Sequence, residues 1–295
     1  MHIPVLLHEV VDGLKAGPGE VILDATVGGG GHSEALCRSV EGKATFVCLD
    51  ADKDAIERSR KRLEACKGTF HFYCTNYRHL DVALQSFGIV GIHRALFDLG
   101  LSSFQLEESG RGFTFMRDEP LLMTFEKERG EGGVTAKQII NEWSAETIAT
   151  LLEAYGEEKQ AWRIAKKIVE ERAKTAITTT LQLASIVESV VRRKGKIHPA
   201  TKTFQALRIA VNDEFQGLKD GLQKAWDRLL PSGRMAVISF HSMEDRVVKD
   251  FFRELGNQGL GTIVTKKPII ASEREVLDNP RSRSAKLRII EKQHQ

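Results

Sequence analysis

Short runs of apolar residues recur along the first hundred positions of the chain, and longer stretches with helical spacing separate them. Each of three runs leads into an aspartate: Val21-Ile22-Leu23 before Asp24, Thr45-Phe46-Val47-Cys48-Leu49 before Asp50, and Ala95-Leu96-Phe97 before Asp98. Another run, Phe70-His71-Phe72-Tyr73, follows a charged stretch from Asp52 to Cys66 that is typical of a surface helix. This alternation predicts an α/β fold with a parallel, doubly wound sheet, whose ligand site lies at the carboxyl ends of the strands.

The alternation stops near residue 105. From there to about residue 200 no strand is predicted, but four helical periodicities occur, at Ala136–Asn141, Ala145–Tyr155, Trp162–Arg172 and Leu181–Arg192. Because so long a stretch cannot be one loop between two strands, we expect an inserted helical domain.

The sheet is then expected to resume. The sequence predicts a helix from about Pro199, a turn at Pro231-Ser232-Gly233 and a strand that ends at Phe240. Thr262–Thr265 and Leu287–Ile290 are expected to form a final antiparallel pair at the edge of the sheet. The expected organisation is a first part of one domain at 1–104, the helical insert at 105–200 and the second part of the first domain at 201–295.

Composition and charge narrow the classes of protein. The 295 residues are 41% hydrophobic and 28% charged, enough for a sizeable core, and the net charge is only +3. Basic residues concentrate locally: between Glu188 and Asp213 there are six Lys or Arg and no acid. The start of the chain does not resemble a signal peptide, no long apolar stretch predicts a membrane span, and the four cysteines match no zinc-binding spacing. We therefore expect a cytoplasmic protein without a metal site.

A glycine-rich loop directly after the first strand is the sharpest candidate for a ligand site. It reads Asp24-Ala25-Thr26-Val27-Gly28-Gly29-Gly30-Gly31-His32-Ser33. Glycines let the backbone approach a ligand closely, and the amides that open the next helix favour negative groups. Asp50 ends the second strand twenty residues after Gly30, where an acid commonly binds both hydroxyls of an adenosine ribose.

Two cofactors fit this arrangement, a dinucleotide and S-adenosylmethionine. Asp24 and Asp98 are both expected at the mouth of the cleft, where each would repel a pyrophosphate by about 4 kcal/mol per charge pair at 4 Å and an effective dielectric constant of 20. They would attract a sulfonium and an ammonium instead. The dinucleotide fingerprint also requires Gly or Ala at the position of Ser33. The charges favour S-adenosylmethionine, although each aspartate alone is also explained as a capping or loop residue.

A set of motifs, in order from His2 to Arg288, resembles the bacterial small-subunit rRNA cytosine-N4 methyltransferase family. Those motifs are His2-Ile3-Pro4-Val5-Leu6-Leu7, Asp24-Ala25-Thr26 with Gly29-Gly30-Gly31-His32-Ser33, Asp98-Leu99-Gly100-Leu101-Ser102-Ser103 with Gln105-Leu106, Arg111-Gly112-Phe113, Tyr155-Gly156-Glu157-Glu158, the run from His198 to Ile209, the run from Ile238 to Arg246, and the run from Asn279 to Arg288.

The resemblance implies a Rossmann-like, S-adenosylmethionine-dependent methyltransferase sheet with an inserted helical domain. It implies methylation of the exocyclic N4 of a cytidine in the decoding region of 16S rRNA, so that the partner is small ribosomal subunit rRNA. By motif position, the implied cofactor contacts are Gly30, Gly31, His32, Asp50, Tyr77, Asp98 and Gln105. The family usually has Phe in place of Tyr77, and either ring can pack on adenine.

One segment departs from the family pattern. Where the family tends to read Pro-Leu-Asp-Met-Arg-Met, this chain reads Pro120-Leu121-Leu122-Met123-Thr124-Phe125. If the missing acid and arginine form a salt bridge in relatives, their joint replacement by Leu122 and Thr124 leaves neither charge stranded and costs little. If either residue touches RNA or cofactor, activity or substrate choice changes.

Transfer of a methyl group from a sulfonium needs an in-line arrangement and no metal or covalent nucleophile, so the protein contributes mainly position and electrostatics. The amino group of cytosine is a poor nucleophile, and a hydrogen-bond acceptor beside it would take the departing proton. Asp98 is the first candidate for this acceptor and His241 the second, because an imidazole titrates near neutral pH. The competing interpretation of His241 is structural, since Ser242 and Asp245 form an S-x-x-D helix cap next to it.

RNA is expected to bind basic and polar side chains on the helix after Pro199 and near the carboxyl end of the chain. The candidates are Lys202, Gln205, Arg208, Arg281 and Arg283. Phe204, Leu207 and Val211 fall on the opposite side of that helix and are expected in the core. The alternative is that these basic residues are merely solvated.

Two other functions compete with the methyltransferase. A catalytically silent RNA-binding assembly factor that retains the cofactor fold would explain the altered segment from Leu122 to Phe125. A nicotinamide oxidoreductase would use the same glycine loop for a dinucleotide. Methyl transfer from labelled cofactor excludes the first, and a thermal-shift comparison of the two cofactors excludes the second.

Overall fold

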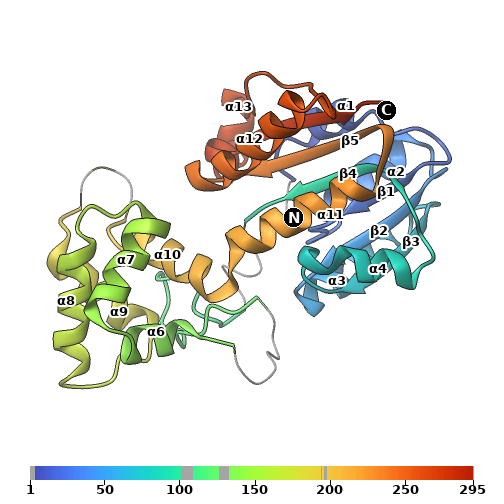
Figure 1. Ribbon diagram of the computed structural model, residues 1–295. Helices are drawn as coiled ribbons and strands as arrows, with labels where there is room; N and C mark the ends of the chain where they lie inside the picture. Colours follow the sequence, from blue (N-terminus) through green and yellow to red (C-terminus); the bar gives the residue numbers. More distant parts are fainter. Residues whose placement is uncertain (1–3, 101–108, 126–132, 194, 196–197, 295) are drawn as a thin grey trace. The chain divides into compact units, whose positions relative to one another are not determined.

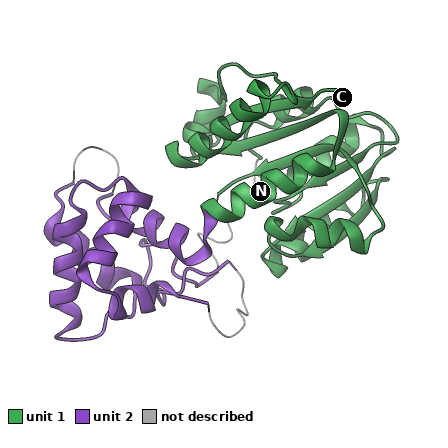
Figure 2. Ribbon diagram, viewed as in Figure 1, with its two compact units in different colours: residues 1–100, 215–295 green, residues 101–214 purple. Residues whose placement is uncertain are grey.

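The protein is described here as a computed structural model that covers residues 4–100, 109–125, 133–193, 195 and 198–294. The chain divides into two compact units, one formed by residues 1–100 with 215–295 and the other by residues 101–214 (Figure 2).

The first unit is built on a mixed sheet with the strand order β3-β2-β1-β4-β5-β8-β6, in which β7 also pairs with β8. The strands are β1 (Val21–Asp24), β2 (Thr45–Asp50), β3 (Thr69–Cys74), β4 (Ile92–Asp98), β5 (Leu229–Ser239), β6 (Gly261–Ile263), β7 (Ile269–Ile270) and β8 (Lys286–Lys292). Strands β1 to β5 are parallel, whereas β8 runs antiparallel to β5, β6 and β7.

Helices cover both faces of this sheet, and short helical segments complete the unit (Figure 1). They are α1 (Leu7–Leu14), α2 (Gly31–Ser39), α3 (Lys53–Leu63), η1 (Tyr77–His79), α4 (Leu80–Ser86), α11 (Glu214–Arg228), α12 (Ser242–Asn257), α13 (Glu273–Asp278) and η2 (Pro280–Ser284). Because strand side chains alternate between faces, Leu23 and Val47 pack with α4, α11 and α12 in one core, while Ile22 and Phe46 pack with α1, α2 and α3 in the other.

The second unit is helical in its described part. Its helices are α6 (Ala136–Glu142), α7 (Ala145–Gly156), α8 (Ala161–Arg172), α9 (Thr180–Val190) and α10 (Thr201–Asn212). Side chains of Thr135 and Ser144 accept hydrogen bonds from backbone amides and thereby cap the starts of α6 and α7. Apolar side chains from all five helices form one separate core, which includes Leu152 and Ile164.

The structure confirms the predicted fold class, a Rossmann-like sheet with a helical insertion, and the antiparallel pairing of β6 with β8. One local expectation is wrong: the predicted turn at residues 231–233 lies within β5. There the pairing of β4 with β5 shifts register between Ile92 and Arg94, and Ser232 has a φ of 60°. An irregularity of this kind keeps the strand continuous, which sequence signals for a turn do not distinguish.

The second unit also contains α10, which the sequence analysis grouped with the second part of the methyltransferase domain. Phe204 and Leu207 of α10 are buried in the same core as Leu152 of α7, as is Val211. The chain returns to the first unit only at Phe215, within α11. The compact unit therefore extends past residue 200.

Candidate functional site

Three carboxylates end three neighbouring strands of the sheet. Asp24, Asp50 and Asp98 are the last residues of β1, β2 and β4, and β1 lies between the other two strands. Because parallel strands present their carboxyl ends at one edge, the fold brings these residues to the same end of the sheet. The strand pattern of the sequence predicted this arrangement.

Asp50 ties the glycine loop to the second strand. Its Oδ2 accepts a hydrogen bond from the Gly28 amide at 3.0 Å, and its Oδ1 accepts one from the Asp52 amide at 2.9 Å. Burial raises the pKa of Asp50 to about 6, against the opposing effect of these two hydrogen bonds. The interpretation of Asp50 as a helix cap is wrong, because the side chain of Asp52 is the N-cap of α3.

Close packing explains why two positions of the glycine-rich loop, Gly30 and Gly31, require glycine. A Cβ on Gly31 would lie 2.3 Å from Cγ of Pro4, and a Cβ on Gly30, whose φ is 76°, would lie 3.3 Å from the Cα of Ser59. A Cβ on Gly29 would meet nothing within 4 Å among the described residues. Gly29, which was not among the predicted cofactor contacts, is therefore the loop position with open space beside it.

Asp24 lies beneath the loop and not at the mouth of a cleft. It is 1% exposed, its Oδ2 accepts a hydrogen bond from the Ser33 hydroxyl at 2.6 Å, and its Oδ1 accepts one from the Thr26 amide at 3.3 Å. Burial raises its pKa to about 6. The expectation that Asp24 sits at the mouth is wrong because the loop folds back over it. Ser33, which breaks the dinucleotide fingerprint, supplies a hydroxyl that Gly or Ala would lack.

Asp98 differs from the other two carboxylates in its hydrogen bonding. Its amide donates to the Thr26 hydroxyl at 2.7 Å, which fixes its backbone, but its buried Oδ1 has no hydrogen-bond partner among the residues that the structure describes. Burial, and next to it the charge of Glu244, raises the pKa of Asp98 to about 7. A buried, unpaired carboxylate oxygen is costly and is satisfied by water, by a cation or by a donor from a ligand.

His32 faces the other oxygen of Asp98. Its Nδ1 lies 3.5 Å from Asp98 Oδ2, and its Nε2 lies 2.9 Å from the carbonyl oxygen of Val5. Because a carbonyl only accepts, Nε2 must carry the proton in the neutral ring, which leaves the lone pair of Nδ1 toward Asp98. Burial lowers the pKa of His32 and so favours this neutral form. Both ring nitrogens therefore have protein neighbours, and a direct contact of this ring with cofactor stays a prediction.

His241 begins α12 as its N-cap residue. Its Nδ1 accepts a hydrogen bond from the Glu244 amide at 3.3 Å, and its Nε2 lies 2.9 Å from Glu244 Oε1. The expected cap by Ser242 and Asp245 is wrong, since Asp245 instead binds the guanidinium of Arg288 at 2.6 and 3.1 Å.

Glu244 itself was missed by the sequence analysis, although its charge acts on Asp98. Its Oε2 accepts a hydrogen bond from the Phe240 amide at 2.8 Å, and it is 3% exposed. Histidine is not a common N-cap, so the motif offered no sign that Glu244 would turn back toward the end of the strand.

The predicted adenine-packing ring, Tyr77, lies in η1 at the start of the segment that follows β3. Its ring meets Phe97 edge-on with 5.8 Å between the centroids, and a Cβ on Gly221 of α11 would lie 2.7 Å from its Cδ2. Tyr77 is thus held by β4 and α11, and its contact with adenine stays a prediction. Gln105 lies outside the described residues.

The side chains of the predicted RNA-binding residues differ in exposure and in the contacts that they make within the protein. Arg208 is held by Glu214 through two hydrogen bonds of 2.7 and 2.8 Å, and the Lys202 ammonium donates to the carbonyl oxygen of Glu157 at 2.8 Å. Gln205 is half-buried. In the other unit, η2 carries Arg281, which is half-buried, and Arg283, which is exposed. The RNA contacts of all five stay predictions.

The segment from Leu122 to Phe125, which departs from the family pattern, is held by hydrogen bonds to its backbone. Leu122 is 38% exposed, whereas Thr124 is buried. The backbone on either side is held by side chains, because Asn212 bonds to the Met123 carbonyl and the Phe125 amide. The two substituted positions therefore place no charge in the core.

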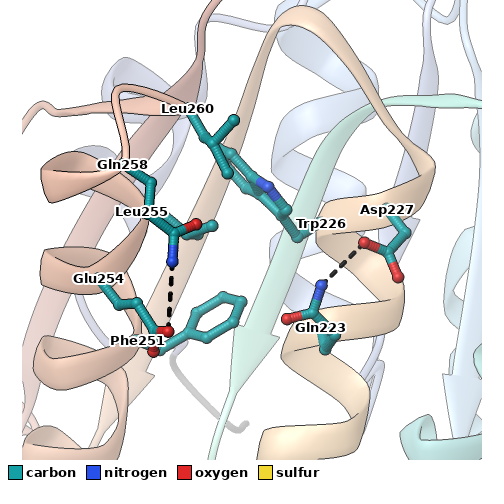
Figure 3. Close-up of a pocket in the computed structure, with 8 residues that line it drawn as sticks. All are labelled: Gln223, Trp226, Asp227, Phe251, Glu254, Leu255, Gln258 and Leu260. Carbon is teal, nitrogen blue, oxygen red and sulfur yellow. Dashed lines mark hydrogen bonds between the residues drawn. The ribbon is translucent and has the colours of Figure 1, made fainter.

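A cavity of about 250 Å³ occurs elsewhere in the first unit, between α11 and α12 (Figure 3). Trp226 and Leu255 are among the apolar residues that line it, while its polar rim is internally paired: Gln223 donates to Asp227, and Gln258 donates to Glu254. None of the predicted site residues lines this cavity. Across the described chain there is no cluster of His, Cys, Asp or Glu suited to a metal ion, and no helix has the length and apolarity needed to cross a membrane.

Comparisons with known proteins extend over the whole chain. The model of the MraW methylase family matches residues 1–293. A protein of Heliobacterium modesticaldum, named ribosomal RNA small subunit methyltransferase H, is 42% identical over 311 residues, covering 99% of this chain and 98% of its own length. Proteins of the same name from Deinococcus radiodurans and Persephonella marina are 44% and 43% identical over 292 and 294 residues; each alignment covers 99% of this chain, and 89% and 99% of the respective relative. The similarity therefore includes both compact units.

Proposed function

The chain belongs to the MraW methylase family, and we propose that it transfers the methyl group of S-adenosylmethionine to the exocyclic N4 of a cytidine in the decoding region of small-subunit (16S) rRNA. The observation that carries this proposal is the carboxylate of Asp98, whose buried Oδ1 has no partner among the described residues and which lies at the same end of the sheet as Asp50 and the glycine loop. Such a site suits a positively charged cofactor better than a diphosphate. The relatives named as ribosomal RNA small subunit methyltransferases support the substrate class.

The residues present fit this cofactor. Asp50 has lone pairs left on both oxygens for ribose hydroxyls, in addition to the amides of Gly28 and Asp52. Asp98 offers Oδ1 to a positive group, and Gly29 leaves space beside the loop. When bound, S-adenosylmethionine supplies an electrophilic methyl group. We retain Tyr77 as the residue that packs on adenine and Gln105 as a further contact.

We propose Asp98 as the acceptor of the proton that leaves the cytosine amino group. A nearby positive charge lowers the pKa of a carboxyl group and keeps Asp98 ionised. Loss of the sulfonium charge on methyl transfer would raise the pKa of Asp98 again and make its carboxylate a better base. His241 is the second candidate: its Nδ1 accepts a hydrogen bond from the Glu244 amide, whereas its Nε2, 2.9 Å from Glu244 Oε1, has no hydrogen-bond partner among the described residues.

We further propose that the helical insert predicted at 105–200 takes part in RNA recognition, together with Lys202, Gln205, Arg208, Arg281 and Arg283. The target base must be unstacked to reach the cofactor. Since the proposed substrate is ribosomal RNA, the expected site of action is the cytoplasm.

The test is methyl transfer from labelled S-adenosylmethionine to small ribosomal subunits that lack the modification, followed by digestion to nucleosides and mass spectrometry. The proposal expects N4-methylcytidine in stoichiometric amount with the wild type and a loss of at least about a hundredfold in rate with Asp98→Asn. RNA binding without methyl transfer would instead support a silent assembly factor. Stabilisation by a nicotinamide dinucleotide, but not by S-adenosylmethionine, in a thermal-shift experiment would support an oxidoreductase.

A further inference from the structure

The outer face of the first half of α8 combines an exposed tryptophan with cations. The side chain of Trp162 is 45% exposed, and the ammonium of Lys166 lies 5.5 Å from the centroid of its ring. Arg163 and Lys159, which precedes the helix, are exposed as well. We call Lys159, Trp162, Arg163 and Lys166 the α8 face; the helix is seen in Figure 1.

The periodicity of the helix fixes these side chains on the outside. Ala161, Ile164, Ala165 and Ile168 form the opposite side of α8 and are buried in the core of the second unit. Trp162 cannot join that core without turning the whole helix. A single exposed aromatic side chain is common on protein surfaces, so it is the cations around Trp162 that distinguish this face.

The charges of the α8 face are also unneutralised. Within the part of the chain that the structure describes, no carboxylate pairs with Lys159, Arg163 or Lys166, and the Arg163 guanidinium donates a hydrogen bond to the side-chain oxygen of Gln160 at 3.0 Å. The neighbouring Lys167 differs, because it lies 3.4 and 2.9 Å from the carboxylates of Glu170 and Glu171. The cations of the α8 face therefore remain available to an anionic partner, whereas Lys167 does not.

We propose that the α8 face is a binding surface for single-stranded RNA, with Trp162 stacked on a base and the three cations next to phosphates. An aromatic platform among basic residues is the usual way in which proteins hold single strands without reading their sequence. Lysine is depleted at the centres of protein–protein interfaces, so Lys159 and Lys166 favour RNA over a protein partner. This inference deepens the proposed function and rests on it for the identity of the RNA.

Fluorescence of the full-length protein tests the proposal, because Trp162 is the most exposed of three tryptophans; Trp226 is 4% exposed and Trp143 is half-buried. The probes are a twelve-nucleotide oligocytidylate and the unmodified small subunit. We expect oligocytidylate to quench the emission of the wild type and Trp162→Ala to remove most of that quenching. Trp162→Ala should weaken binding at least about fivefold, and Lys166→Gln should reduce the slope of log affinity against log salt by about 0.7.

The matched control is Lys167→Gln, one position along the same helix, which should leave the salt slope unchanged because Glu170 and Glu171 already neutralise that charge. Circular dichroism and the affinity for S-adenosylmethionine should be the same in all variants. Wild-type RNA affinity and unchanged quenching in Trp162→Ala would overturn the proposal. So would a polyglutamate that quenches Trp162 while oligocytidylate does not, since this would indicate an acidic protein partner.

Failure of this inference is distinguishable from failure of the proposed function. If the wild type methylates small subunits and Trp162→Ala has the same KM for them and the same RNA affinity, the α8 face is not an RNA surface while the enzyme stands. If the wild type transfers no methyl group but Trp162→Ala still weakens RNA binding about fivefold or more, the surface stands while the enzyme does not.

Discussion

Binding of S-adenosylmethionine should weaken as the pH falls through 7. The pKa of Asp98 lies at about 7 in the ligand-free protein, so half of the molecules hold a proton there at neutral pH. A positive ligand prefers the ionised carboxylate, and the proton must leave when the ligand binds. For one group of this pKa, the apparent Kd rises about tenfold between pH 8 and pH 6, which corresponds to about 1.4 kcal/mol. Asp50, with a pKa of about 6, would add about a factor of two at pH 6 if it ionises as well.

Isothermal titration calorimetry measures this directly. Titrations at pH 7 in two buffers of different ionisation enthalpy should show release of about half a proton per bound ligand. In Asp98→Asn both the pH dependence and the proton release should fall sharply. In Glu244→Gln the dependence should move to lower pH, because the like charge that raises the pKa of Asp98 is gone. An affinity that is constant from pH 6 to pH 8, or an Asp98→Asn variant that keeps the full dependence, would refute the reasoning.

Three further predictions concern stability. Burial raises the pKa of Asp24 from 3.8 to about 6, so its carboxyl contributes stability that is present below pH 4 and is lost as the pH rises through 6. Between pH 4 and pH 8 the unfolding free energy of the wild type, measured with denaturant, should therefore fall by up to about 3 kcal/mol more than that of Asp24→Asn. A methyl group on Gly31 would collide with the ring of Pro4, so Gly31→Ala should lower the Tm by several degrees. Gly29→Ala should keep the wild-type Tm and weaken cofactor binding, and equal Tm values for the two variants would contradict this. Asp245→Asn leaves the buried Arg288 without its charged partner and should cost about 3–5 kcal/mol of unfolding free energy, while a loss below 1 kcal/mol would show that the pair is unimportant.

Much of the sheet was predictable because its strands have a clear local signal in the sequence. A short apolar run that ends at a polar residue predicts both a buried strand and the place where it stops, and Asp24, Asp50 and Asp98 follow from that rule. The helical insert was equally visible, since its helices have clear apolar periodicity and capping residues such as Thr135 and Ser144.

What the sequence could not provide are contacts between residues far apart in the chain. Nothing near Asp98 indicates that Glu244 acts on it, and nothing near His32 indicates that the carbonyl of Val5 fixes its protonated nitrogen. Arg208 looked free for RNA on a helical wheel, but Glu214, beyond the end of that helix, folds back to hold it. Such pairings depend on tertiary packing, which residue patterns do not encode one element at a time.

The central claim is that the strand-end carboxylates hold a positively charged adenosyl cofactor, and a crystal structure of the protein grown with S-adenosylmethionine tests it most directly. We predict density for the whole cofactor, with the ribose hydroxyls on Asp50 and a positively charged group within about 4 Å of Asp98 Oδ1. The glycine loop should pass beside it at Gly29. An ordered loop with no adenosyl density at saturating cofactor, or a cofactor bound away from Asp50 and Asp98, would contradict the account.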